Sequence, residues 1–114
     1  GENEYSLSGM HEMIEAKACD ILMPDLQRIG GISEMRKVAN LAESYNLPIS
    51  THIFTEHSLS VAGSVTNCLS VEHMPWFSKL FNEQIDVING YIDIPERPGT
   101  GFTFNDSYIK QFII

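Results

Sequence analysis

The chain has 114 residues, 43% of them hydrophobic, and carries 15 acidic against 7 basic side chains for a net charge of −8. This length is typical of one domain, and the lack of clustered Lys and Arg argues against a nucleic-acid partner. No stretch approaches the roughly 20 apolar residues of a membrane span, and no basic-then-apolar leader opens the sequence. We therefore expect a cytoplasmic protein with no membrane partner.

The first thirty residues predict a helix, a strand and a loop. Residues 8–18 place apolar side chains at helical spacing, and Ser8 is a candidate cap for that helix. Residues 21–23 form a short apolar run that Pro24 stops, which is typical of a buried strand. Residues 24–31 have the composition of a loop.

The next forty residues repeat this alternation. The clearest helix is predicted over residues 35–45, where one apolar stripe faces a charged stripe. A brief strand is expected at 48–51, a weaker helix at 58–65, and another strand at 69–71. Short apolar strands separated by helices indicate an α/β protein with a parallel sheet.

The character of the sequence changes after residue 83. Residues 84–94 alternate around Asn89-Gly90, which predicts a β-hairpin, and Asn105 is a candidate cap for a short terminal helix. We therefore divide the chain into an α/β section at 1–83 and a tail with a β-hairpin and a terminal helix at 84–114.

An ionisable residue directly follows each apolar run of the α/β section. Asp25, His52 and Glu72 stand 27 and 20 residues apart, and Glu2 precedes Asp25 by 23. These spacings match one strand–helix unit each. In a (β/α) barrel, residues at the carboxyl ends of the strands face a shared mouth that carries the chemistry. Because these residues recur at the same point of successive strand–helix units, we predict that the four side chains share one site.

Four segments hold these residues: Gly1-Glu2-Asn3, Asp20-Ile-Leu-Met-Pro-Asp-Leu-Gln-Arg-Ile-Gly-Gly31, Ser50-Thr-His52 and Val71-Glu72-His73. They resemble the enolase superfamily, specifically its mandelate racemase-like subgroup with the acid-sugar dehydratases of the talarate/galactarate type. The tail runs Leu80-Phe-Asn-Glu-Gln-Ile85 and Pro98-Gly-Thr-Gly101 strengthen the resemblance. It covers nearly all of this chain but only about the last third of a family member.

The resemblance implies roles for individual residues. His52 matches the general acid/base that meets one face of the substrate, and Asp25 matches the carboxylate that orients its ring. Glu72 matches the carboxyl group that hydrogen-bonds a substrate carboxylate, and Glu2 matches one carboxylate ligand of Mg²⁺. The implied reaction removes the proton α to the carboxylate of an acid sugar through an enediolate. Arg28 could contact a substrate carboxylate.

The sequence also departs from the family pattern. It contains no Lys-x-Lys pair for the second base, no further carboxylate strand ends for the metal, and no capping domain. Because the chain begins at Gly1 without an initiator Met, we expect a processed or cut product. The predicted fold is thus the C-terminal part of a TIM-type barrel, an incomplete barrel of about three βα units plus the tail. On its own it should bind Mg²⁺ weakly or not at all and be inactive.

Purely structural interpretations stay open beside these. Asp25 could simply form a turn, His52 could be a satisfied residue at a strand end, and Glu72 or Arg28 could be a solvated surface charge. The terminal Glu2 could be frayed. Two alternative functions follow: a non-catalytic, self-associating fragment, or a small α/β binding module. Because open sheet edges promote pairing, we expect a homo-oligomer.

Overall fold

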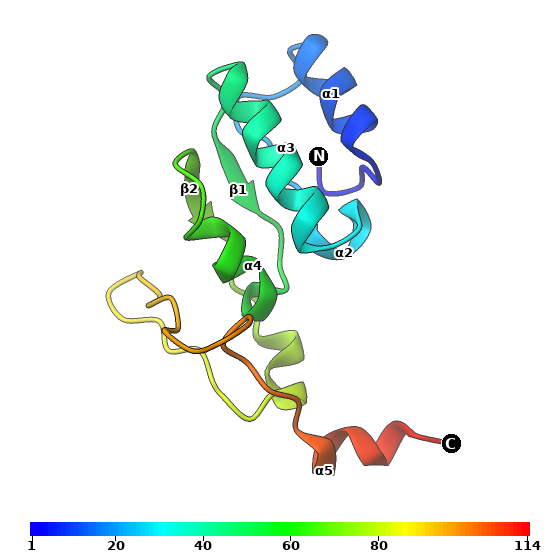
Figure 1. Ribbon diagram of the computed structural model, residues 1–114, viewed down its shortest axis with the longest axis vertical. Helices are drawn as coiled ribbons and strands as arrows, with labels where there is room; N and C mark the ends of the chain where they lie inside the picture. The colour runs from blue at the N-terminus through cyan, green and yellow to red at the C-terminus, as the bar shows by residue number, and fades with distance from the viewer.

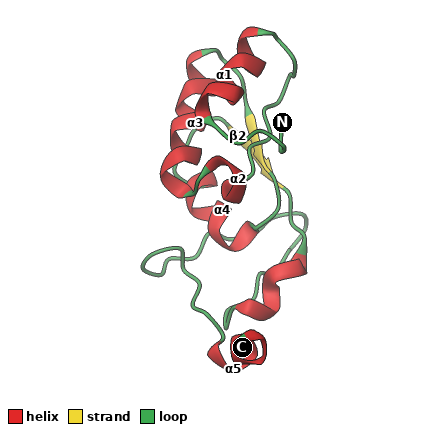
Figure 2. Ribbon diagram, turned by 90° about the vertical axis from the view of Figure 1, so that its right-hand side faces the viewer, coloured by secondary structure: helices red, strands yellow, loops and turns green.

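The computed structural model describes residues 1–114 and contains a two-stranded parallel sheet with helices on one face (Figure 2). Strand β1 (Ile49–Thr51) pairs with β2 (Cys68–Val71), so the predicted α/β class with a parallel sheet is confirmed. The helices are α1 (Leu7–Glu15), α2 (Leu26–Ile29), α3 (Ile32–Ser44), α4 (Thr55–Ala62) and α5 (Asp106–Ile109), with 3₁₀ turns η1 (Pro75–Leu80) and η2 (Lys110–Phe112). None of them combines the length and apolar character needed to cross a bilayer.

The predicted strand at 21–23 is not a regular strand. The segment lies beside β1 and forms only two isolated bridges, Leu22 with Ile49 and Asp25 with His52. Pro24 has no N–H to donate into the ladder, although its carbonyl accepts from the N–H of His52 at 3.1 Å. The hydrogen bonds that remain are enough to keep this segment parallel to β1, which places Asp25 next to His52.

Helix α3 supplies the largest share of the core, as its apolar stripe predicted. Met35, Val38, Ala39 and Ala42 are all fully buried. They belong to one cluster of eleven buried residues that also includes Met10 and Ile14 of α1, Leu22, Leu26, Ile29, Ile49 and Val61. The core therefore lies between the sheet and its single layer of helices.

Several local boundaries differ from the sequence predictions, three of them near the ends of helices. Ser6 rather than Ser8 caps α1, because its side chain accepts the N–H of Gly9 at 3.0 Å. The expected loop at 24–31 contains the short helix α2, which the side chain of Asp25 caps. Helix α4 begins at Thr55, three residues before the predicted start, since the chain turns directly from β1 into the helix.

The tail contains the predicted turn but little of the predicted hairpin. Asn89 and Gly90 both have positive φ, at 51° and 83°, which suits a tight hairpin turn. Only Ile88 and Tyr91 pair across it, and Tyr91 is 79% exposed. A two-stranded hairpin that is paired at a single position gains little stability. The tail lies beyond α4, with α5 at the end of the molecule opposite α1 (Figure 1). As predicted, Asn105 caps α5.

Aromatic side chains join the tail to α4. Phe81 is buried and stacks on Phe104 with ring centroids 5.4 Å apart. His57 of α4 contacts both Phe54, at 4.7 Å, and Phe81, at 5.4 Å between ring centroids. Its Nδ1 is buried and has no hydrogen-bond partner. Burial lowers the pKa of His57 below its ordinary value of 6.5, and the charge of Glu56 only partly opposes this.

This lowered pKa predicts a loss of stability in mild acid. The unfolded chain binds a proton at His57 near pH 6.5, while the folded chain binds it only at lower pH. The contribution of His57 is therefore complete above pH 6.5 and declines as the pH falls through that value. We expect the denaturant midpoint to fall between about pH 7.5 and about pH 5.5, and to fall less in His57→Phe. An equal decline in His57→Phe would contradict the assignment, and His11→Phe on the surface of α1 is the control.

Candidate active site

Asp25 is the most buried ionisable residue of the candidate site. Its side chain is 2% exposed. One oxygen, Oδ1, accepts the backbone N–H groups of Gln27 at 2.8 Å and Arg28 at 2.9 Å, which caps α2. The same cap fixes the rotamer of the carboxylate, so the second oxygen, Oδ2, points toward the end of β1.

His52 directly follows β1, and its imidazole ring is hydrogen-bonded to Asp25 Oδ2. Its Nδ1 lies 2.7 Å from Asp25 Oδ2, and its side chain is 19% exposed. A carboxylate at this distance holds the proton on Nδ1, which leaves Nε2 as the nitrogen that can accept or donate a proton. The pair therefore has the geometry of an oriented acid/base group.

Glu72 directly follows β2 and lies on the Nε2 side of the imidazole. Its Oε2 is 3.7 Å from His52 Nε2 and accepts the backbone N–H of Ile53 at 3.2 Å. Ile53 and Phe54 have φ values of 28° and 47°, a left-handed backbone that is unusual for such bulky residues. This strained turn aims the N–H of Ile53 at Glu72, and strain of this kind is typical of functional sites.

Thr55 is a supporting residue that the sequence analysis did not identify. It is fully buried, and its hydroxyl donates to the backbone carbonyl of Glu72 at 3.1 Å. Its oxygen also lies 3.2 Å from Nδ1 of His73. Thr55 thus ties the start of α4 to the end of β2. A threonine three residues after His52 carries no sequence signal of this contact.

Glu2 and Arg28 lie on the Asp25 side of the site. Arg28 Nη1 donates to the backbone carbonyl of Glu2 at 3.0 Å and is 3.8 Å from Asp25 Oδ2. The pKa of the Glu2 carboxyl is lowered, chiefly because the carboxyl accepts a hydrogen bond from the backbone N–H of Glu2 itself. Nearby positive charge, which includes His52, lowers this pKa further, and desolvation opposes the shift. All five residues that the sequence analysis selected therefore lie around one end of the sheet.

The residues of this chain do not by themselves form a metal centre. No group of three or more His, Cys, Asp or Glu side chains is placed so that it could hold a metal ion. The side chain of Glu2 accepts a hydrogen bond from Asn3 at 3.0 Å. One carboxylate does not supply the several oxygen ligands that Mg²⁺ requires.

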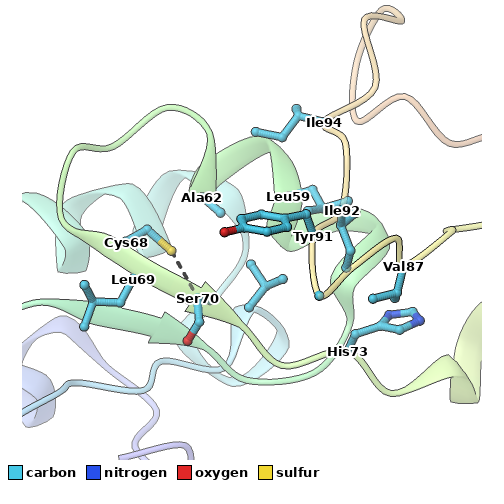
Figure 3. A pocket seen from close by; sticks show the side chains of 12 residues that line it. Leu59, Ala62, Cys68, Leu69, Ser70, His73, Val87, Tyr91, Ile92 and Ile94 are labelled. Carbon is cyan, nitrogen blue, oxygen red and sulfur yellow. Dashed lines mark hydrogen bonds between the residues drawn. The ribbon is translucent and has the colours of Figure 1, made fainter.

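An apolar cavity of about 350 Å³ lies elsewhere, between β2, α4 and the turn at 87–94 (Figure 3). Leu59, Tyr91, Ile92 and Ile94 line it, with His73 at one side. Asp25, His52 and Glu72 are not among its lining residues. The cavity is therefore separate from the cluster of ionisable side chains.

Comparison with known proteins identifies the family of the chain. Residues 1–108 match the model of the enolase C-terminal domain-like family. The chain belongs to this family. The resemblance to the enolase superfamily that the sequence motifs predicted is thus confirmed.

Relatives of the chain include acid-sugar dehydratases. The chain is 39% identical to a D-xylonate dehydratase of Haloferax volcanii, covering 100% of this chain and 30% of the relative. It is 32% identical to an L-talarate/galactarate dehydratase of Salmonella typhimurium, covering 93% and 27%. A crystal structure of L-talarate dehydratase from Polaromonas sp. JS666, complexed with Mg and L-glucarate, matches with a TM-score of 0.89 and 35% identity, covering 96% and 31%. The chain spans about 30% of the length of these relatives.

The separate roles of the two Asp25 oxygens, one capping α2 and one bonding His52, can be tested with Asp25→Asn. Asparagine keeps a side-chain oxygen for the α2 cap, but its amide nitrogen cannot accept the proton of His52 Nδ1. We expect the ring to change to the tautomer protonated at Nε2, which ¹⁵N NMR of the imidazole nitrogens measures. Asp20→Asn, at an exposed carboxylate, is the control. Unchanged ring-nitrogen shifts in Asp25→Asn would contradict the arrangement.

Proposed function

We propose that the chain is the C-terminal part of a Mg²⁺-dependent acid-sugar dehydratase or related racemase and carries its His–Asp acid/base pair. The 2.7 Å contact between His52 Nδ1 and Asp25 Oδ2 is the observation that carries the proposal. The family match over residues 1–108 and the dehydratase names of the relatives support it. The substrate class would be a polyhydroxylated carboxylate.

In the same proposal, the α/β section is part of a (β/α) TIM-type barrel. Three chain segments run parallel, the one ending at Asp25 and the strands β1 and β2. Each is followed by a helix or helical turn, and each ends at an ionisable residue. The carboxyl ends of parallel barrel strands form the mouth where active sites lie, so this arrangement is the one expected of about three consecutive barrel units.

The proposed mechanism begins at His52 Nε2. With Nδ1–H donated to Asp25, Nε2 can take the proton from the carbon α to the substrate carboxylate in a racemase, or give a proton to the departing hydroxyl in a dehydratase. The Asp25 carboxylate stabilises the imidazolium in the steps where His52 carries the proton. Nδ1 is occupied by its hydrogen bond with Asp25, so Nε2 is the nitrogen left to exchange protons with the substrate.

Glu72 is proposed to stabilise the charge that develops on the substrate. Its carboxyl group lies 3.7 Å from His52 Nε2, so both groups can face one substrate carboxylate. In its protonated form Glu72 would donate to a carboxylate oxygen while the enediolate forms, and a donor fixed before the reaction is effective because it needs no reorganisation. The hydrogen bond from Ile53 fixes the orientation of Glu72.

Glu2 is proposed to give one carboxylate ligand to Mg²⁺, with the remaining ligands coming from outside this chain. The solved relatives that contain magnesium support this cofactor. When bound, the ion would neutralise negative charge on the substrate carboxylate. Because the chain offers a single such ligand, we propose that the 114 residues alone are inactive.

The geometry bears on the alternative of a small binding module and on the predicted role of Arg28. A small binding module that shares only the fold would not need Asp25 and His52 in contact, so their 2.7 Å separation favours the catalytic proposal. The side chain of Arg28, the predicted substrate contact, is 34% exposed, and one of its N–H groups already donates to the backbone carbonyl of Glu2.

The catalytic proposal predicts the effect of two substitutions in the protein as encoded by its gene, tested with D-xylonate, galactarate and L-talarate. His52→Asn should abolish turnover while Mg²⁺ affinity stays close to that of the unmodified protein. Asp25→Asn should lower kcat by roughly 10⁴-fold, by analogy with other carboxylate–histidine pairs. His11→Asn in α1 is the matched control. Full activity in either site variant would contradict the proposed acid/base roles of His52 and Asp25. Loss of metal binding in His52→Asn would contradict them as well.

We also propose that the 114-residue chain self-associates. One edge of β2 has no partner strand, and Leu69 on it is 63% exposed beside the apolar cavity of Figure 3. An unpaired edge next to apolar side chains favours strand pairing between copies. Light scattering should give a mass above that of a monomer, reduced in Leu69→Lys. Tyr5→Lys, at an exposed residue far from β2 in sequence, is the control. A monomer with one cooperative melting transition would refute this.

A further inference from the structure

Arg28 contacts the buried carboxylate of the site through both its backbone and its side chain. Its N–H donates to Asp25 Oδ1 at 2.9 Å, and its Nη1 lies 3.8 Å from Asp25 Oδ2. The same Nη1 donates to the backbone carbonyl of Glu2 at 3.0 Å, across 26 residues of sequence. Arg28 is therefore the one side chain that joins the segment of Glu2 to the Asp25–His52 pair.

The charge of Arg28 matters most when His52 is neutral. Asp25 is 2% exposed, and a carboxylate that deep in a protein is costly unless an opposite charge compensates it. His52 supplies that charge only while it is protonated, and an acid/base group must spend part of each turnover neutral. The guanidinium of Arg28 keeps its proton throughout, so it compensates Asp25 in both states of the imidazole.

The hydrogen bond to Glu2 has a second consequence. The backbone carbonyl of Glu2 has no regular strand partner, because residues 1–4 lie outside the sheet. Its contact with Arg28 fixes the backbone next to the proposed carboxylate ligand at a set distance from Asp25. The guanidinium donates one N–H to the Glu2 carbonyl while its charge lies beside Asp25, whereas a lysine ammonium is a flexible point charge without this fixed planar geometry.

We propose that Arg28 is a positioning residue that holds the Glu2 backbone against Asp25 and compensates the Asp25 charge while His52 is neutral. The catalytic part of this inference rests on the function proposed above. The structural part, the effect of Arg28 on the Asp25–His52 hydrogen bond, does not. Arg28 acts through Asp25 and Glu2 and need not touch the substrate.

The test compares Arg28→Met, which keeps an unbranched apolar stem without the guanidinium, with Arg28→Lys, which keeps the charge. Arg36→Met on the exposed face of α3 is the matched control. In the 114-residue chain, ¹H NMR follows the proton that His52 Nδ1 shares with Asp25, and ¹⁵N relaxation follows the Glu2 amide. In the protein as encoded, kcat and KM are measured with D-xylonate, galactarate and L-talarate.

We expect Arg28→Met to shift or broaden the Nδ1 proton signal, to make the Glu2 amide more mobile, and to lower kcat by about 10- to 100-fold with little change in KM. Arg28→Lys should restore the proton signal in part but leave Glu2 mobile. A raised KM with unchanged kcat and an unchanged proton signal would overturn the proposal in favour of a substrate contact. Unchanged values in every measurement would overturn it in favour of a surface charge.

The two levels of the inference fail separately. If the unmodified protein turns over none of the three acid sugars, the proposed function fails. A shifted Nδ1 proton and a mobile Glu2 amide in Arg28→Met would still support the positioning role. If turnover is present and both NMR signals of Arg28→Met match those of the control, the positioning role fails while the proposed function stands.

Discussion

The site depends on a single carboxylate that serves two purposes. One oxygen of Asp25 caps α2, and the other bonds the ring of His52. Because the cap fixes the carboxylate, the orientation of the imidazole is set by the local backbone. In the proposed function, an acid/base group held in this way would lose little entropy when it reacts. The short helix α2 is thus a part of the site, although only four residues form it.

The parallel sheet explains how residues 27 and 20 positions apart meet. Parallel segments end at the same edge of a sheet, so whatever follows each of them gathers there. The left-handed backbone at Ile53 and Phe54 then turns the chain away into α4 while leaving the N–H of Ile53 for Glu72. Membership of the enolase C-terminal domain-like family agrees with this use of the strand ends.

The layering of the molecule is one-sided. Helices α1, α3 and α4 lie on one face of the sheet (Figure 2), while the outer edge of β2 has no partner strand. The hydroxyls of Ser50 and Ser70 meet at 2.9 Å across the two strands. The buried core is formed by α1, α3 and the side of the sheet that faces them. The exposed apolar side chains near β2 remain available for further contacts.

The sequence by itself determined the family, the parallel α/β class, the long helix around Met35 and the cap at Asn105, because periodicity, caps and motif spacing are local patterns. It also selected the residues that meet at the sheet end. It could not decide the irregular segment at 21–25, where a missing N–H interrupts the ladder, or the extent of the hairpin, which pairs only at Ile88 and Tyr91. Only the tertiary structure placed Thr55 against Glu72 and Arg28 against Glu2, because such contacts depend on how distant segments are brought together.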